Sequence, residues 1–205
     1  NMMRFTTMKT KLRKYPSIFL ILLLAISSCF LTGCVNQHPK DSKKSSQGES
    51  VETMLEITDP KEKQAVLNAK AKVKALSGNP RIVATSPAVA DICDKLDLDL
   101  VGVPKSSVSK IPSRYKKVKK VGLAMSPDME IVSSLNPDWI LAPSSLETDL
   151  KPKFEELKNT EYAFLNLRSV QGMYRSVQEL GEIFGKQQEA EKMTKEFTTF
   201  YKSYT

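Results

Sequence analysis

The 205-residue sequence is poor in the residues that metal centres and disulfide frameworks need, since it has one His and three Cys. A structural zinc site takes four such ligands at close spacing, which argues against a His/Cys metal cage. The sequence also lacks a GxGxxG loop, a Walker loop, an HExxH motif and a GxSxG elbow. The single histidine, His38, lies in a polar segment, so hydrolytic triads and zinc catalysis have no visible base. These absences disfavour an enzyme.

Charge and apolar residues are both plentiful. Lys and Arg number 31 against 23 Asp and Glu, a formal charge of +8, and 40% of the residues are hydrophobic. With 26% charged residues, 8 Gly and 11 Pro, the chain is neither collagenous nor disordered by composition, and a globular core is expected. A basic balance of this size ordinarily suggests a nucleic acid or an acidic membrane surface as partner.

The N-terminal segment has the pattern of a signal peptide. Residues 1–33 hold five basic residues and no acid, followed by an apolar run from Ile18 to Ile26 that is too short for a permanent membrane span. The run leads to Leu31-Thr32-Gly33-Cys34, which resembles a bacterial lipobox. We therefore expect cleavage after residue 33, lipidation of Cys34 (diacylglyceryl and palmitate) and a cell-membrane lipoprotein on the extracytoplasmic face, of the Gram-positive type. The alternative is a short anchor with an incidental cysteine.

Removal of residues 1–33 changes the charge argument. It leaves 26 basic against 23 acidic residues, or +3, so nucleic acid binding loses its main support. The remaining basic cluster, Lys116 to Lys120 beside Arg114 and Tyr115, is typical of a solvated loop. Cys93 then stands alone, so no structural disulfide is available. Residues 34–53 hold the lipidated cysteine and a polar, flexible tether.

From residue 54 onwards, helical and strand patterns alternate. The segment 54–78 is predicted to be a leading helix, opened by the capping box Asp59-Pro60-Lys61-Glu62. Strands are predicted at 81–85, 98–103, 138–141 and 162–165, and helices from Ser86-Pro87, from Ser126-Pro127, and at 147–157, 170–183 and 187–204. This order predicts an α/β fold with a parallel sheet, a Rossmann-like lobe over residues 79–186.

The last predicted helix carries an apolar stripe and has no stop signal. Its stripe is Ala190, Met193, Phe197, Phe200, Tyr201 and Tyr204. An uncovered aromatic stripe predicts that residues 187–205 begin a helix which continues into a second lobe, so that the sequence is truncated after its first lobe.

Two Ser-Pro helix starts are candidate sites. A helix N-terminus presents free N–H groups and a positive dipole end, so the start at Ser86 suits a carboxylate or phosphate, although Ser86 can equally be a plain N-cap. At the second start, Met125 precedes the expected cap Ser126, but Glu130 occupies the position that a hydrophobic staple would use. Met125 is therefore either a core residue or a thioether ligand for soft iron or copper, including heme iron.

Two further stretches, RIVATSPAVADICDKLDLDLVGV from Arg81 and VGLAMSPDMEIVSSLNPDWIL from Val121, resemble a known family. From Arg81 to Thr205 the chain is similar to the N-terminal lobe of the lipoproteins that bind iron-siderophores, vitamin B12 or heme for ABC importers. The segments around Lys95 to Leu98, Pro112 to Lys116 and Gly122 to Pro127 are most similar to the heme receptors of Gram-positive bacteria. The motif around Asn136-Pro137-Asp138 is common to the family and says nothing of the ligand.

The resemblance implies roles for individual residues. Met125 matches an axial ligand of heme iron, with the second ligand a histidine of the other lobe. The amides at Ser86, Ala88 and Val89 lie where propionates are held, although Pro87 has no N–H. A length difference in the loop that holds Ser107 and Lys110 leaves their propionate contacts open. Glu130 matches a glutamate that engages arginines of the permease.

The resemblance implies capture without catalysis. A monomeric, two-lobed receptor would bind heme as transported cargo and deliver it to an ABC permease and its ATPase for iron acquisition. A ferric siderophore or cobalamin receptor of the same fold stays open, with Met125 as a packing residue. From another class, a protein-interaction lipoprotein or an unrecognised enzyme also stays open.

Overall fold

The computed structural model describes residues 4–5 and 55–203 of the chain. In chain order its elements are β1 (Arg4–Phe5), α2 (Pro60–Lys74), β2 (Ile82–Ala84), α3 (Pro87–Lys95), β3 (Leu100–Val103), the 3₁₀ turn η1 (Ser113–Tyr115), β4 (Lys119–Lys120), β5 (Gly122–Leu123), β6 (Ser126–Pro127), α4 (Met129–Ser134), β7 (Trp139–Pro143), the 3₁₀ turn η2 (Ser144–Leu146), α5 (Glu147–Glu155), β8 (Glu161–Leu165), α6 (Val170–Phe184) and α7 (Gln187–Lys202).

The main sheet has the order β1-β8-β7-β2-β3-β4. β2, β3, β4, β7 and β8 run parallel, and β1 pairs antiparallel with β8 through Arg4 and Phe164. The chain moves outward from β2 to β3 and β4, then crosses to β7 and β8 on the other side. The strand order therefore reverses between β2 and β7, which is where open parallel sheets bind ligands.

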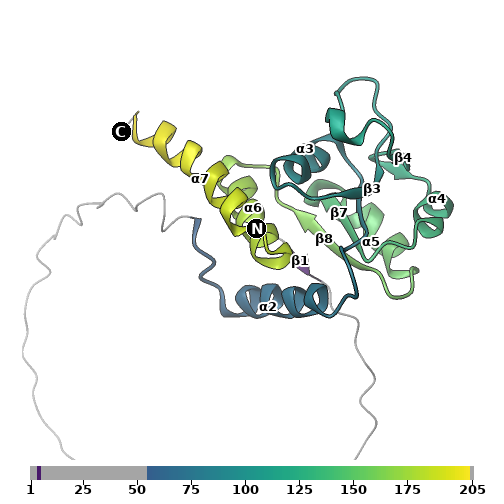
Figure 1. Ribbon diagram of the computed structural model, residues 1–205, viewed down its shortest axis with the longest axis horizontal. Helices are drawn as coiled ribbons and strands as arrows, with labels where there is room; N and C mark the ends of the chain where they lie inside the picture. The colour runs from purple at the N-terminus through teal and green to yellow at the C-terminus, as the bar shows by residue number, and fades with distance from the viewer. Residues whose placement is uncertain (1–3, 6–54, 204–205) are drawn as a thin grey trace, which may run out of the picture. The chain divides into compact units, whose positions relative to one another are not determined.

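Helices cover both faces of this sheet, with α6 and α7 on one side and α4 and α5 on the other (Figure 1). Along β7, Trp139 and Leu141 belong to the core with α2, α3, α6 and α7, whereas Ile140 and Ala142 belong to the core with α4 and α5. Successive side chains of a strand point to opposite faces, so a strand buried on both faces reads as a continuous apolar run. The predicted α/β fold with a parallel sheet is confirmed.

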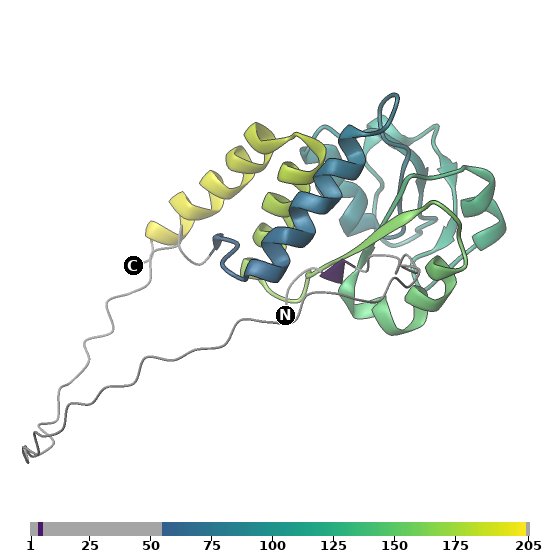
Figure 2. The same cartoon turned by 90° about the horizontal axis from the view of Figure 1, so that it is seen from below.

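α2, α6 and α7 lie side by side against one edge of the lobe (Figure 2). α2 starts where the sequence predicts, because Asp59 accepts a hydrogen bond from the Lys61 amide at 2.8 Å. Glu62, the expected second half of the capping box, is instead buried against α6. Gly181 of α6 lets α7 approach closely, since a Cβ there would lie 2.6 Å from the Cβ of Ala190.

One local prediction is wrong. Ser126 is not a helix cap: it pairs with Leu123 in the hairpin β5–β6, and Asp128 caps α4.

The basic cluster at 114–120 is largely exposed, as predicted for a solvated loop. Within it, however, Tyr115 is buried, and Arg114 forms ion pairs with acidic side chains of the α3–β3 region, Asp94, Asp97 and Asp99.

The N-terminal half of the predicted α7 stripe is covered by the lobe. Ala190 is buried, Met193 packs against the main core and Phe197 stacks on Tyr174 of α6 at 4.5 Å between ring centres, while Phe200 is exposed. Packing within the lobe thus covers three of the six stripe residues, and the continuation of this helix into a second lobe stays a prediction.

Several predictions fall outside the described residues. Apart from β1, the predicted signal peptide, the lipidation site Cys34, the tether and His38 are not described, and they stay predictions. Within residues 4–5 and 55–203, none of the helices combines the length and apolar character that crossing a bilayer requires.

Candidate functional site

The loops that follow the five parallel strands form one edge of the sheet, which we call the carboxyl edge. It consists of residues 85–88 after β2, 104–110 after β3, 121–127 after β4, 144–146 after β7 and 166–169 after β8. Because these strands are parallel, their carboxyl ends meet at this edge, and the loops are not bound by the regular pairing of the sheet. All the predicted ligand contacts, at Ser86, Ala88, Val89 and Met125, fall on the carboxyl edge or on the first turn of α3 that it leads into.

Ser86 begins α3 at the point where the strand order reverses. It has extended backbone angles, and its Oγ accepts a hydrogen bond from the Val89 amide at 3.2 Å. The structural reading of Ser86 as an N-cap is therefore confirmed, and the Val89 amide already has a partner. Pro87 has no N–H, and Ala88 is exposed at the second helical position, where a helix leaves its amide without an intrahelical partner. Of the predicted donors, Ala88 is the one in the best position to meet an anion.

Met125 lies in the two-residue turn of the hairpin β5–β6, beside Ala124. Gly122 makes this turn possible, because its φ is +98° and a Cβ there would lie 2.9 Å from the Asp128 amide nitrogen. Backbone hydrogen bonds hold the hairpin at both ends, from Lys105 N to Gly122 O and from Asp128 N to Val121 O, each 2.7 Å.

The Met125 side chain is 73% exposed, so it does not fill the core of the described lobe. Because Asp128 is the cap of α4, the hydrophobic staple positions are Pro127 and Val132, which are both buried. Two other apolar side chains of this edge are exposed, Leu123 at 58% and Val108 at 94%. Isolated exposed apolar residues are ordinary, but three in two hydrogen-bonded loops form a surface suited to an apolar partner.

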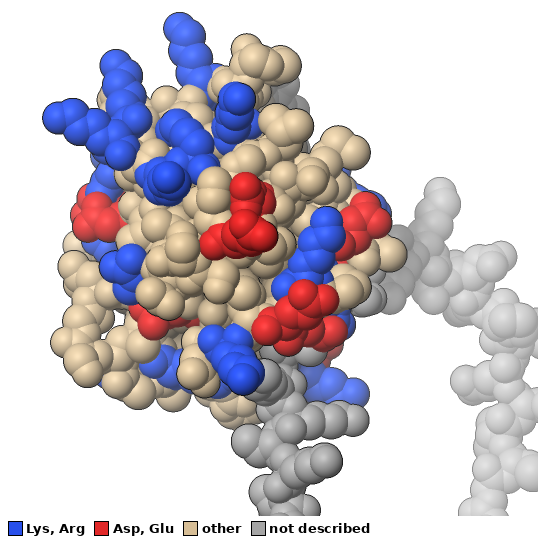
Figure 3. Space-filling view, turned by 90° about the vertical axis from the view of Figure 1, so that its right-hand side faces the viewer, with Lys and Arg blue, Asp and Glu red and all other residues tan. Residues whose placement is uncertain are grey.

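The same loops are basic. Residues 104–110 and 121–127 contain two basic residues, Lys105 and Lys110, and no acidic one. Lys105 and Lys110 are exposed, as are Ser107 and Val108 between them. Figure 3 shows basic side chains gathered at one end of the face over β4 and α4. A ligand at the hairpin would thus meet apolar side chains and positive charge together.

The β2 and β4 loops are separated by β3 in the sheet, which is about 10 Å at the usual strand spacing. Ala88 and Met125 therefore stand on opposite sides of the loop after β3. Glu130 is exposed on α4, where its amide donates to the Asp128 carboxylate at 3.1 Å. It lies outside the carboxyl edge, so it is free to meet a different partner from the one that meets Met125.

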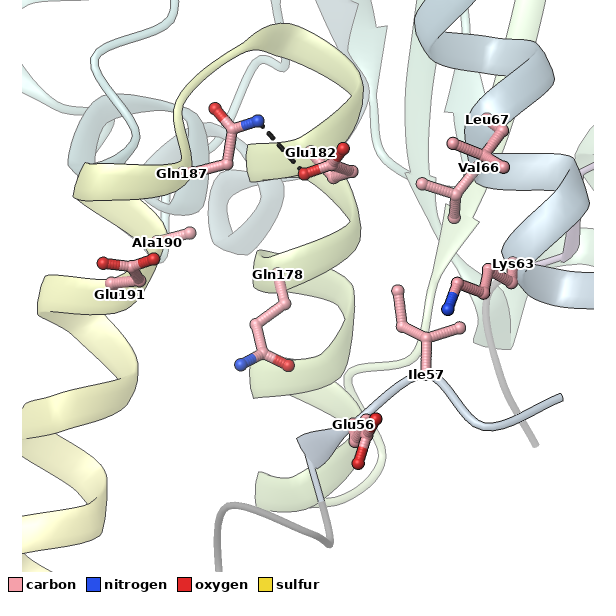
Figure 4. A pocket seen from close by; sticks show the side chains of 10 residues that line it. All are labelled: Glu56, Ile57, Lys63, Val66, Leu67, Gln178, Glu182, Gln187, Ala190 and Glu191. Carbon is pink, nitrogen blue, oxygen red and sulfur yellow. Dashed lines mark hydrogen bonds between the residues drawn. The ribbon is translucent and has the colours of Figure 1, made fainter.

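Sequence reasoning missed one polar feature, the buried cluster of Glu62 from α2 with Arg175 and Glu179 from α6. A signal was present, since Glu179 lies three residues from Ser176 and four from Ile183, on the buried face of α6. A separate groove of about 540 Å³ runs between α2, α6 and α7 (Figure 4). Ile57, Val66 and Leu67 form its apolar side, and Gln187 donates to Glu182 across its end at 3.0 Å.

The sequence pattern of the family described as periplasmic binding protein matches residues 82–203, which is more than half of the chain. The chain belongs to the periplasmic binding protein family. Its match covers every described element from β2 to α7 and excludes α2.

Individual relatives are named for uptake and substrate binding. IsdE of Staphylococcus aureus (strain Newman), a high-affinity heme uptake system protein, is 36% identical over 117 residues, which are 57% of this chain and 39% of that protein. The crystal structure of S. aureus IsdE complexed with heme has a TM-score of 0.56 at 34% identity and covers 60% of this chain and 46% of that chain.

Two other solved structures share the fold. An ABC transporter substrate-binding protein from Listeria monocytogenes EGD-e has a TM-score of 0.57 at 44% identity, covering 60% of this chain and 46% of that chain. The siderophore-binding protein BauB, bound to acinetobactin and ferric iron, has a TM-score of 0.51 at 25% identity, covering 59% and 45%. The chain thus spans less than half the length of the relatives that it matches.

Proposed function

We propose that this protein is the substrate-binding component of an ABC importer and that it captures heme for iron acquisition. It would bind heme as cargo without chemical change and hand it to a permease, as a lipoprotein anchored through Cys34 to the outer face of the cell membrane. The observation that carries the proposal is the exposed Met125 in the turn of the hairpin β5–β6 on the carboxyl edge. The similarity of this chain to the heme uptake protein IsdE supports heme as the ligand.

Each group at the edge has a separate task in this proposal. The Met125 thioether is a soft ligand that suits heme iron. Leu123 and Val108 offer apolar contact for the porphyrin ring, which gains by leaving water. The exposed amide at Ala88 and the basic loop with Lys105 and Lys110 offer charge-assisted hydrogen bonds to the propionates. Glu130, outside the edge, would face the permease in the loaded receptor.

The test is a hemin titration of the full chain followed by absorption spectroscopy. Met125→Leu keeps an apolar side chain of similar size and removes the sulfur, so the Soret band of the complex should shift and the affinity for hemin should fall. Met193→Leu, on α7 and away from the carboxyl edge, is the matched control and should keep the wild-type spectrum. An unchanged spectrum in Met125→Leu would show that Met125 is not an iron ligand.

A ferric siderophore is the second candidate, because Lys105 and Lys110, in edge loops without an acidic residue, also suit an anionic iron chelate. In that case a ferric siderophore should raise the melting temperature of the protein while hemin leaves it unchanged, and Met125→Leu should have no effect on either. A thermal shift is the suitable assay, since Trp139 is buried against Phe184 at the other end of β7 and is remote from the edge.

A further inference from the structure

Between α2 and α6 the structure buries acidic side chains with too few partners. Glu179 is 1% exposed, and both of its carboxylate oxygens lack a hydrogen-bond partner among the described residues. The same holds for Oε2 of Glu62, which lies 3.5 Å from Nη2 of Arg175. That guanidinium group also donates to the carbonyl oxygen of Glu56 at 3.1 Å, so one arginine faces two carboxyl groups and a carbonyl.

A carboxylate without hydrogen bonds is costly to bury, and such a group commonly keeps its proton instead. Burial raises the pKa of Glu179 to about 8, the nearby Glu62 raises it further, and Arg175 opposes both effects. Burial likewise raises the pKa of Glu62, where Arg175 again opposes it and Asp59 adds to it. One positive charge therefore does not compensate two ionised acids at this position.

The other charged contacts of α2 are paired conventionally. Lys70 forms an ion pair with Glu182 of α6, and Lys72 forms one with Glu161 of β8. The hydrogen bond from Lys70 lowers the pKa of Glu182, so that carboxyl group does not titrate near neutral pH. The C-terminal half of α2 is thus held by opposite charges, and Val66 and Ala69 are buried in its middle. Only the N-terminal half depends on the acid cluster.

We propose that α2 is a strap whose N-terminal half is held on α6 by protonation of the Glu62–Glu179 pair and is released when the pair ionises. The proton leaves to solvent, and the two carboxylates then repel each other across the interface. α2 precedes the family match at 82–203 and connects the lobe to the residues before it. Release would therefore loosen the N-terminal half of α2 from α6 without altering the carboxyl edge.

The direction of the pH effect follows from the shift of Glu179. Its pKa in the docked helix is about 8, above the ordinary value of 4.5, so the docked state binds the proton more tightly. Docking is strongest below about pH 4.5, weakens as the pH rises toward 8, and then stays level. One proton corresponds to a change of about tenfold in the opening equilibrium for each pH unit in that window.

Hydrogen–deuterium exchange of the full chain in detergent tests the proposal. After division by intrinsic exchange rates, opening of the amides of residues 61–67 should rise about tenfold per unit between pH 5 and 8 and level off above 8. Amides of β2 and β7 should show no such rise. An absent rise in residues 61–67, or an equal rise in β2 and β7, would overturn local release of α2.

Variants test whether ionisation of Glu179, and not a general effect of pH, causes the opening of α2. Glu179→Gln should remove most of the rise, whereas Glu156→Gln, at an exposed position on the opposite face of the sheet, should keep it. The carbon-13 resonance of the Glu179 carboxyl group should titrate near pH 8, and at a lower pH in Glu62→Gln. A wild-type midpoint near 4.5, or a full rise in Glu179→Gln, would contradict the proposal; the titration applies even if Glu179→Gln fails to fold.

Discussion

At the carboxyl edge the apolar side chains of Met125, Leu123 and Val108 are exposed to solvent. Between α2 and α6, by contrast, the acidic side chains of Glu62 and Glu179 are buried. Both regions depart from the usual distribution of side chains, in opposite directions. Burial of apolar surface stabilises a fold by about 25 cal/mol for each Å². The exposed side chains of the edge do not contribute this free energy to the lobe. The helix interface accepts a cost that only protonation reduces.

The difference teaches where to expect a ligand and where to expect conditional stability. Exposed apolar side chains cost the fold little and remain available to a partner that covers them. Buried acids give a partner nothing to contact, but they make the contact between two helices depend on pH. The proposed ligand edge and the proposed strap of this lobe share no residues.

The largest expected effect contrasts packing at α6 with packing at the edge. Leu180 is fully buried on α6, so Leu180→Ala should lower the free energy of unfolding by about 2–5 kcal/mol. Met125→Ala should change it by less than about 0.5 kcal/mol, because most of its side chain is exposed to solvent. Urea denaturation of the full chain measures both, and a loss above about 1 kcal/mol in Met125→Ala would mean that the edge is part of the core.

An intermediate effect is expected at the hairpin that presents Met125. Gly122→Ala should cost about 1–3 kcal/mol, because its φ of +98° and the nearby Asp128 amide leave no room for a Cβ. Hemin binding should fall with it, since the turn that carries Met125 would shift. Gly78→Ala is the control: nothing lies within 4 Å of a Cβ there, and the stability should stay close to that of the wild type. Equal stability of the two variants in urea would argue against a strained hairpin.

The smallest effect separates the two roles of Ser86. Ser86→Ala should lower stability by about 1 kcal/mol because the Val89 amide loses its cap. Ser86→Asp should restore most of that stability, since aspartate caps as well as serine, yet its charge should weaken the binding of hemin several-fold. Urea denaturation and hemin titration of both variants provide the comparison. Full hemin affinity in Ser86→Asp would remove the α3 N-terminus from the ligand site.

Local signals were sufficient for most of the fold. Asp59 before Pro60 and Ser86 before Pro87 correctly marked the starts of α2 and α3, because a cap depends on residues only two or three positions away. Ser126-Pro127 carried the same signal and was wrong. There the pairing of Ser126 with Leu123 fixes a hairpin turn, and Asp128 offers an equally good cap two residues later.

The candidate site was predictable in part. The strand–helix alternation correctly placed Ser86 and Ala88 after a parallel strand, and the family resemblance singled out Met125. The pattern left Met125 open between a core residue and a ligand, because the exposure of its side chain depends on which elements cover the hairpin. The basic lysines at 116–119 are exposed as predicted, but the pattern did not reveal that Tyr115 beside them is buried or that Arg114 is paired with three acids.

By itself the sequence determined that this protein is an α/β lobe with parallel strands, because the periodicities of 2 and 3.6 and the caps are local properties. Only the tertiary structure decided that Met125 faces water and that Glu62 meets Glu179. Both outcomes depend on contacts between segments far apart in the chain, where the packing of whole helices and strands determines which side chains keep their solvent. The sequence contains Met125, Glu62 and Glu179, and the fold exposes the methionine to solvent and buries the two acids.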